Sequence, residues 1–348
     1  MPCCVGSEWM VQEGKYMTTS RPQVPVLLLI DVEPDGFFID RTEKAPWSGF
    51  ERAMEIMADM RLLLAQKTTG SAHFTWLVRS DSQVAETYHS PAWAFEHYGE
   101  AFRRLSAACD EIGLHVHPYR WDAADNDWVD DYGNQEWVNH CVHMGVCAFE
   151  KFFQRKPASF SMGMDWTNQA TIELVSDLQI RHEFSTILGK EAQPFPTVGV
   201  YTGVAPDCSR IPQRPYRPSR KNFLSPAAHQ GAGIWIFPQS SRVVRLPRSW
   251  KRKLYELVRM RPVPPHYTRK FFLQDDPAAL RAAIDITLSR LGRPYLTFAV
   301  RTHEFTKPER IAIIRRNLEG TLEHPAAARF VFTTPAQALR ILGYTDAG

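Results

Sequence analysis

Two carboxylates follow the longest apolar run near the start of the chain. Asp31 and Glu33 come directly after VPVLLLI, within the segment IDVEPD. Residues two apart in an extended chain point the same way, so these two carboxylates converge on one point. They repel each other unless a cation lies between them or one of them takes up a proton. Asp35 has a simpler explanation, because the sequence PDG that contains it is typical of a turn.

A pair of histidines closes a second apolar run. His115 and His117 lie in the segment EIGLHVHPY, again two residues apart. On one face of a strand, their ring nitrogens reach a single metal ion, and imidazole is a common ligand of zinc. A single histidine is usually structural or faces solvent, whereas such a pair at the end of a strand indicates metal ligation.

A third group follows the apolar run LTFAV. Arg301 and His303 alternate in the segment AVRTHEF. Taken alone, His303 fits an exposed loop. Together with the other two groups, it is a candidate for the acid that protonates a leaving group, and Arg301 is a candidate for holding an anion or orienting Asp31. Carboxylates and histidines around an open coordination position fit metal-assisted hydrolysis, in which the ion acidifies water and polarises an acyl carbonyl.

The elements that position these residues alternate along the chain. Continuous apolar runs alternate with amphipathic helical patterns, which is typical of βαβ units and a parallel sheet. In such folds, active sites lie at the carboxyl ends of the strands. The expected strands are 26–31, 72–78, 111–117, 158–163, 181–186, 295–301 and 329–334. The expected helices are 50–66, 92–109, 134–154, 168–179, 277–291, 307–319 and 335–342.

The alternation breaks over residues 190–270, which are rich in proline and carry a basic tract. We therefore expect a disordered leader over 1–22 and one α/β barrel, or an open barrel-like sheet, over 23–345. The segment at about 190–270 is expected to be a large insertion.

Composition excludes several classes of protein. The chain has 348 residues and a formal net charge of +3, which argues against a nucleic-acid-binding protein. No apolar run approaches the length that spans a bilayer, and no export signal is visible. The six cysteines form no CxxC pair, so we expect reduced thiols and a cytoplasmic protein.

Residues 242–270 contain ten Lys or Arg and one acid, Glu256. The stretch SWKRKLYELVRM (249–260) has the pattern of a basic amphipathic helix. Such a segment can contact an anionic inner-membrane surface or bind a lipid- or nucleotide-linked, phosphorylated sugar carrier. The alternative is a solvated surface helix on the insertion.

The order of these motifs resembles the polysaccharide deacetylase superfamily, the chitin-deacetylase-like carbohydrate esterases. The resemblance covers about 25–190 and 277–345, and it implies a deformed β/α barrel. IDVEPD is similar to the family's first motif, which implies Asp31 as the base and Glu33 as a metal ligand. EIGLHVHPY is similar to the second motif, which implies His115 as a ligand. THEF is similar to the late motif, which implies His303 as the acid.

The chain departs from the family pattern at two positions. Tyr119 stands where the second ligand histidine is expected, so His117 must substitute for that ligand. Ser161, in SFSMGMDW, stands where an arginine is expected, and Arg301 is the candidate to compensate.

The resulting expectation is a zinc-dependent hydrolase with Glu33, His115 and His117 as ligands. It would remove an acyl group from an N-acetylated sugar in bacterial surface-polysaccharide assembly. Two alternatives stay open. One is an inactive barrel that binds a glycan or a protein partner. The other is a glycoside hydrolase on a related barrel, which would use two carboxylates that flank the scissile bond.

Overall fold

The structure of the protein is a computed structural model. It describes residues 22–36, 41, 44–194, 204–228, 233–245, 266–290, 292 and 294–344. The expected leader, apart from Pro22, and the helix expected over 249–260 lie outside these ranges. No helix among the described residues is long and apolar enough to cross a membrane.

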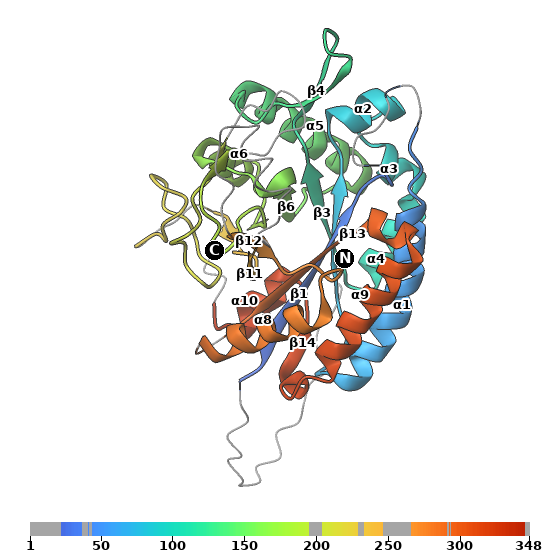
Figure 1. Ribbon diagram of the computed structural model, residues 1–348. Helices are drawn as coiled ribbons and strands as arrows, with labels where there is room; N and C mark the ends of the chain where they lie inside the picture. The colour runs from blue at the N-terminus through green and yellow to red at the C-terminus, as the bar shows by residue number, and fades with distance from the viewer. Residues whose placement is uncertain are drawn as a thin grey trace, which may run out of the picture.

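A curled parallel sheet forms the centre of the molecule (Figure 1). Among the described residues it has eight strands in the order β10-β7-β6-β3-β2-β1-β13, with β14 also paired to β1. Its strands are β1 (Val24–Val32), β2 (Thr75–Arg79), β3 (Glu111–Val116), β6 (Ser159–Met162), β7 (His182–Glu183), β10 (Trp235–Ile236), β13 (Leu296–Arg301) and β14 (Phe330–Phe332). Three two-stranded hairpins accompany it: β4 (Tyr119–Asp122) with β5 (Asp127–Asp130), β8 (Gln193–Pro194) with β9 (Val204–Ala205), and β11 (Ser241–Arg245) with β12 (His266–Lys270).

Helices flank the sheet, and α1 and α9 lie side by side (Figure 1). Within the described ranges the α-helices are α1 (Ser48–Lys67), α2 (Ser82–Tyr88), α3 (Trp93–His97), α4 (Gly99–Ala107), α5 (Gln135–Phe153), α6 (Gln169–Asp177), α8 (Pro277–Arg290), α9 (Pro308–Leu322) and α10 (Pro335–Ile341). In α1 the buried residues recur at the helical spacing that the sequence predicts, for example Phe50, Ala53, Met57, Met60 and Leu64. Asp35 accepts hydrogen bonds from the backbone nitrogens of Ser48 and Gly49, so its carboxylate stabilises the start of α1.

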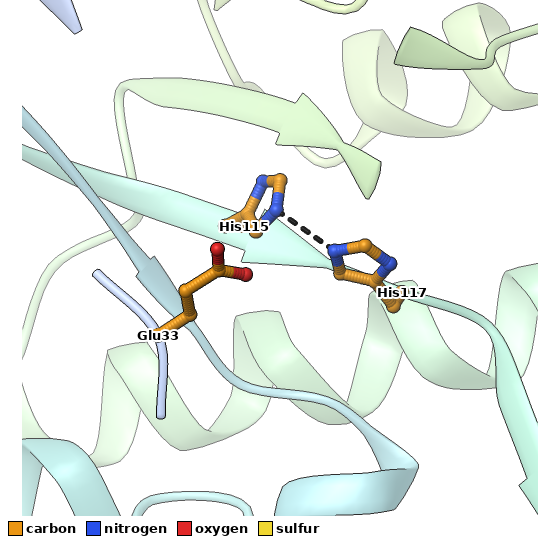
Figure 2. A group of neighbouring side chains, drawn as sticks. All are labelled: Glu33, His115 and His117. Atoms are coloured by element: carbon orange, nitrogen blue, oxygen red, sulfur yellow. Dashed lines mark hydrogen bonds between the residues drawn. The ribbon is translucent and has the colours of Figure 1, made fainter. Parts of the chain in front are cut away.

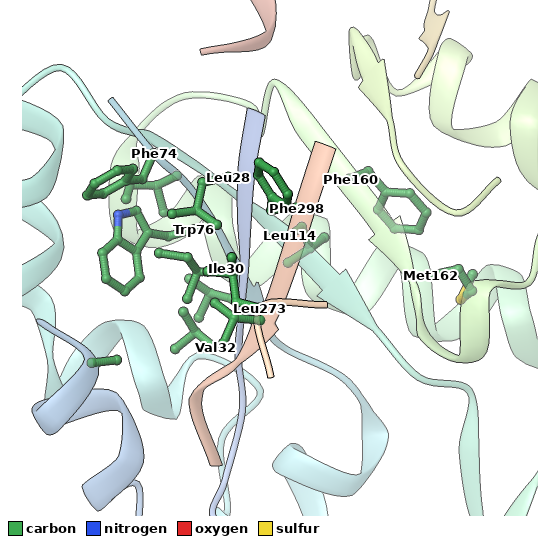
Figure 3. Close-up of a cluster of buried hydrophobic side chains, with 14 of the residues drawn as sticks. Leu28, Ile30, Val32, Phe74, Trp76, Leu114, Phe160, Met162, Leu273 and Phe298 are labelled. Atoms are coloured by element: carbon green, nitrogen blue, oxygen red, sulfur yellow. The ribbon is translucent and has the colours of Figure 1, made fainter. Parts of the chain in front are cut away.

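The two faces of β1 belong to two separate apolar clusters. Leu28 and Ile30 pack in the large cluster between the sheet and the helices (Figure 3). Leu27 and Leu29 point the other way and pack in a smaller cluster with Leu339 of α10. The continuous apolar run of β1 therefore reflects burial on both faces, as expected for a parallel sheet.

The open side of the curled sheet is bridged beyond β10 and β13. Ser240 and Thr297 exchange two hydrogen bonds, 2.6 Å from the Ser240 nitrogen to Thr297 Oγ1 and 3.0 Å from the Thr297 nitrogen to Ser240 Oγ. Phe271 donates its backbone N–H to the carbonyl oxygen of Ser240 and accepts one from Ala299. These contacts join the two ends of the sheet around an enclosed interior.

The structure corrects three expectations. The helix expected over 92–109 is divided at Tyr98 into α3 and α4, and α2 was not expected. At the division, a Cβ on Gly99 would lie 2.6 Å from the Phe152 ring, so the backbone approaches α5 closely. The range 190–270 does not lie wholly outside the barrel, because β10 from within it pairs with β7 in the main sheet.

The basic tract is partly described. Arg242 and Arg269 both pair with Asp275, each at 3.1 Å, so part of its charge is balanced within the fold.

Candidate functional site

The carboxylates of the first motif lie on the inner face of β1. Leu27 and Leu29 point into the enclosed interior, and Asp31 and Glu33 continue the same alternation towards the carboxyl end of the strand. Both are buried, at 4% and 2% exposure. The first group expected from the sequence therefore lies at the mouth of the barrel.

Glu33, His115 and His117 come together at this mouth (Figure 2). One ligand atom from each of the three lies within 4.8 Å of the others, and all three residues are buried. The Nε2 atoms of the two histidines are 3.0 Å apart. The sequence predicts this convergence, and the structure brings the three residues together.

The ring of His115 is oriented by the neighbouring strand. Its Nδ1 lies 3.1 Å from the backbone oxygen of Ser161 on β6. A carbonyl oxygen only accepts, so Nδ1 carries the proton and the lone pair of Nε2 points into the cluster. Ser161, where the family pattern has an arginine, thus contributes to the site through its backbone.

His117 is held from three directions. Its ring stacks on Tyr119, with centroids 5.0 Å apart and planes 3° apart. Its backbone nitrogen donates to Asp81 at 3.0 Å. On a third side lies Gly163, where a Cβ would sit only 2.2 Å from His117 Nδ1. Burial, followed by the charge of Arg79, holds the pKa of His117 well below its ordinary value, so the ring is neutral at pH 7.

Arg79 and Asp81 are site residues that the sequence reasoning missed. Asp81 caps α2 by accepting from the Val84 nitrogen at 3.1 Å, and it also accepts from Arg79 Nε at 2.8 Å. The Arg79 guanidinium lies 5.2 Å from the centre of the Tyr119 ring. Together they hold Tyr119 and the backbone of His117. An acid three residues before Val84 is an N-cap signal that would have indicated α2.

Glu33 is surrounded by groups that stabilise its charge. Its Oε1 lies 3.0 Å from His303 Nδ1 and 3.9 Å from Arg301 Nε. The hydroxyl of Thr302 contacts the Glu33 backbone nitrogen and oxygen, each at 2.9 Å. Burial alone would raise the pKa of Glu33, but the hydrogen bond from His303 and the charge of Arg301 lower it to about 2.

His303 is protonated at neutral pH. Burial would lower its pKa, but hydrogen bonds to Glu304 and Glu33 outweigh that effect and raise the pKa to about 9. The ring is 18% exposed, so it can reach a molecule bound at the mouth. A protonated imidazole beside a buried carboxylate is suited to donating a proton.

Asp31 lies one pleat deeper than Glu33. Asp31 is in register with Arg301 on the neighbouring strand β13. Burial would lower the pKa of Arg301, but the charges of Glu33 and Asp31 raise it. Asp31 is not a member of the Glu33–His115–His117 cluster. The structure thus separates the two carboxylates of the first motif into different positions.

The cluster fits a divalent metal ion by its donor set. Two imidazoles and one carboxylate form a known ligand set of catalytic zinc, and the ligands must be a neutral histidine and an ionised carboxylate. His117 and Glu33 are held in these states by their surroundings. A backbone carbonyl that accepts from the far nitrogen of a ligand histidine, as Ser161 does, is the usual support around such ions.

No protein-family model matches the sequence, and no curated protein is similar to it. Solved structures are similar in fold. The PuuE allantoinase has a TM-score of 0.51 at 13% identity, over 94% of this chain and 93% of that one. A putative polysaccharide deacetylase from Mycobacterium smegmatis has a TM-score of 0.49 at 13% identity, over 97% of both chains. A probable polysaccharide deacetylase from Pseudomonas aeruginosa PAO1 has a TM-score of 0.49 at 12% identity, over 92% of this chain and 91% of that one.

The likeness to the allantoinase shows the fold. It confirms the expectation of a deformed β/α barrel, here a curled parallel sheet with the buried Glu33–His115–His117 cluster at its mouth. The chain therefore shares its overall fold with this allantoinase.

Proposed function

We propose that the protein is a metal-dependent hydrolase that removes an acyl group from an N-acetylated sugar, with zinc as the ion. The observation that carries this proposal is the convergence of Glu33, His115 and His117 within 4.8 Å, with protonated His303 beside Glu33. A divalent ion, when bound there, supplies Lewis-acid polarisation and lowers the pKa of water.

The chain's own residues supply the proton transfers. Asp31, inside the mouth, takes a proton from the attacking water as its oxygen bonds to the acyl carbon. His303 donates a proton to the amide nitrogen as the C–N bond breaks, which yields a carboxylic acid and a free amine. The acid ionises by releasing its proton to water, and the proton on Asp31 returns to His303 through solvent. Arg301 is in register with Asp31 and lies 3.9 Å from Glu33, where its charge stabilises the ionised form of Glu33.

The test combines metal content with product analysis. Purified protein should bind about one equivalent of zinc, and zinc should raise the unfolding temperature by mass action. The double variant His115→Ala, His117→Ala should lose both effects, and it should release no acetate from N-acetylated oligosaccharides. Wild-type protein that binds no zinc, or that hydrolyses after complete chelation, would contradict the proposal.

Single variants separate the roles. Asp31→Asn should keep the metal and lose activity, whereas Glu33→Gln should lose part of both, because it removes a charged ligand. His303→Ala should keep the metal and slow hydrolysis by about 100-fold, the usual scale for a positioned acid. Release of reducing ends in place of acetate would favour a glycoside hydrolase, and glycan binding without any product would favour an inactive barrel.

A further inference from the structure

A second feature opens beside the metal cluster. A cleft of about 340 Å³ runs from Arg301 and Glu304 to Lys190, Arg269 and Lys270. Arg301 lies where the cleft meets the Glu33–His115–His117 cluster, because its Nε is 3.9 Å from Glu33 and its side chain also lines the cleft. The volume suits one sugar-sized group. A molecule whose amide reaches the cluster would therefore extend into this cleft.

The lining of the cleft is positively charged. Of the residues that line it, four are cations and two are carboxylates, Asp165 and Glu304. Glu304 is already engaged by cations outside the lining, since it lies 3.5 Å from Arg310 and 3.6 Å from His303. Asp165 lies 2.7 Å from Lys270, which is only 6% exposed. Arg269 lies 3.1 Å from Asp275, but Arg242 shares that carboxylate at the same distance.

Three of these cations gather around one ring. Arg269, Lys270 and Arg301 lie 4.9, 5.2 and 5.4 Å from the centre of Phe272. Each cation is attracted to the electron-rich face of the ring. The three positive charges around it also repel one another, because water is partly excluded there. An anion bound among them would relieve that repulsion.

The backbone that carries Asp165 is strained. Met164 and Asp165 are consecutive non-glycine residues with φ values of 57° and 53°. Such left-handed conformations persist where the surroundings hold them, and they concentrate at functional sites. Here Lys270 holds the Asp165 side chain at the wall of the cleft.

We infer that this cleft binds an oxyanion, a carboxylate or a phosphate, that belongs to the same saccharide as the acyl amide. The inference rests on the proposed function and narrows its substrate to an anionic sugar. Arg269 and Arg301 offer the planar forks that pair with carboxylate and phosphate oxygens, and Lys190 and Lys270 add point charges.

Calorimetric titration of the full-length protein tests the inference. The probes are N-acetylglucosamine, its 6-phosphate and the corresponding N-acetylated uronic acid, which separate phosphate from carboxylate. At least one anionic probe should bind about tenfold or more tightly than the neutral sugar, and added salt should reduce that preference. Equal affinity for the neutral and both anionic probes would overturn the inference.

Variants connect the preference to the cleft. Lys190→Gln combined with Arg269→Gln should abolish the preference for the anion, whereas Arg269→Lys, which keeps the charge, should retain most of it. Arg103→Gln is the matched control, because Arg103 is 62% exposed on α4 and does not line the cleft. An unchanged preference in the double variant, with its unfolding temperature near wild type, would also overturn the inference.

The outcomes distinguish this inference from the proposed function. Binding is measured without hydrolysis, so an anion preference without any acetate release would contradict the proposed function alone. If the protein hydrolysed neutral and anionic sugars and also bound them with equal affinity, only this inference would be contradicted.

Discussion

At the scale of single residues, the position of His117 depends on the lack of a side chain at Gly163. Tyr119 stacks on one face of the imidazole, and the Cα of Gly163 lies close to its Nδ1 edge. Any residue other than glycine at 163 would place a Cβ 2.2 Å from Nδ1 and 2.3 Å from Cε1. Those distances are shorter than van der Waals contact, so the ring would have to move.

We therefore expect Gly163→Ala to displace His117 and to weaken zinc binding by about 10- to 100-fold, the usual cost of disturbing the support of a ligand. Gly320→Ala in α9 is the control, because no atom lies within 4 Å of its added Cβ. The control should keep zinc affinity and gain up to about 1 kcal/mol of stability from helix propensity. Calorimetry with zinc and denaturant unfolding measure the two effects, and equal zinc affinities in both variants would contradict the expectation.

Several site residues follow from local patterns and others do not. Alternation along β1 and β3 predicts that Glu33, His115 and His117 converge, because residues two apart share a strand face. The contribution of Ser161 is a backbone oxygen, which no side-chain pattern reveals. Asp165 meets Lys270 across 105 residues of sequence, and nothing local in either segment indicates that contact.

At the scale of elements, the short strand β7 carries a buried acid. Glu183 is completely buried and accepts a hydrogen bond from the Ser185 nitrogen at 2.6 Å. Burial raises its pKa to about 7, against the opposing effect of the Ser185 hydrogen bonds. The folded protein therefore keeps this proton over a pH range in which the unfolded chain has released it.

This difference sets the sign of a pH effect. Between pH 4.5 and about 7 the folded state binds more protons than the unfolded state, so stability falls as pH rises through that window. Across this window the free energy of unfolding falls by up to about 3 kcal/mol. Glu183→Gln should remove most of this pH-dependent fall, and urea unfolding at pH 5 and pH 8 would measure the change. Glu191 is exposed, so the control variant Glu191→Gln should show the same dependence of stability on pH as wild type. If Glu183→Gln also kept the wild-type pH dependence, the raised pKa of Glu183 would be contradicted.

Long periodic segments are the elements that the sequence predicts well. The run that forms β1 and the helical spacing of α1 and α5 each agree with the structure within a few residues. β7, which lies within the strand expected over 181–186, is only two residues long. β10 is also two residues long, too short for a periodic signal, and it exists because it pairs with β7. β10 stands within a proline-rich stretch, which is why 190–270 resembles an insertion throughout.

At the scale of the whole molecule, the curled sheet is joined by the reciprocal hydrogen bonds of Ser240 and Thr297. Each side-chain oxygen accepts the backbone N–H of the other residue, and both residues are buried. Loss of either oxygen leaves a buried N–H without that acceptor, which costs about 1–3 kcal/mol.

We expect Ser240→Ala and Thr297→Val each to destabilise the protein by about that amount. The double variant should cost less than the sum, because breaking one bond already loosens the other. Thr287→Val is the control, since its hydroxyl bonds only within α8 at 2.9 Å and should change stability by about 0.5 kcal/mol or less. Denaturant unfolding of the four proteins measures the coupling, and strict additivity would show that the two bonds act independently.

The place of β1 between β2 on one side and β13 and β14 on the other also governs how the protein is made. The ribosome releases β1 first, but its partner β13 begins only at Leu296. Until β13 has been synthesised, one edge of this mostly apolar strand stays without its neighbours, which is the kind of segment that chaperones shield. His303, which contacts Glu33, follows β13 in the chain, so a nascent chain cannot complete the site before that part has been synthesised.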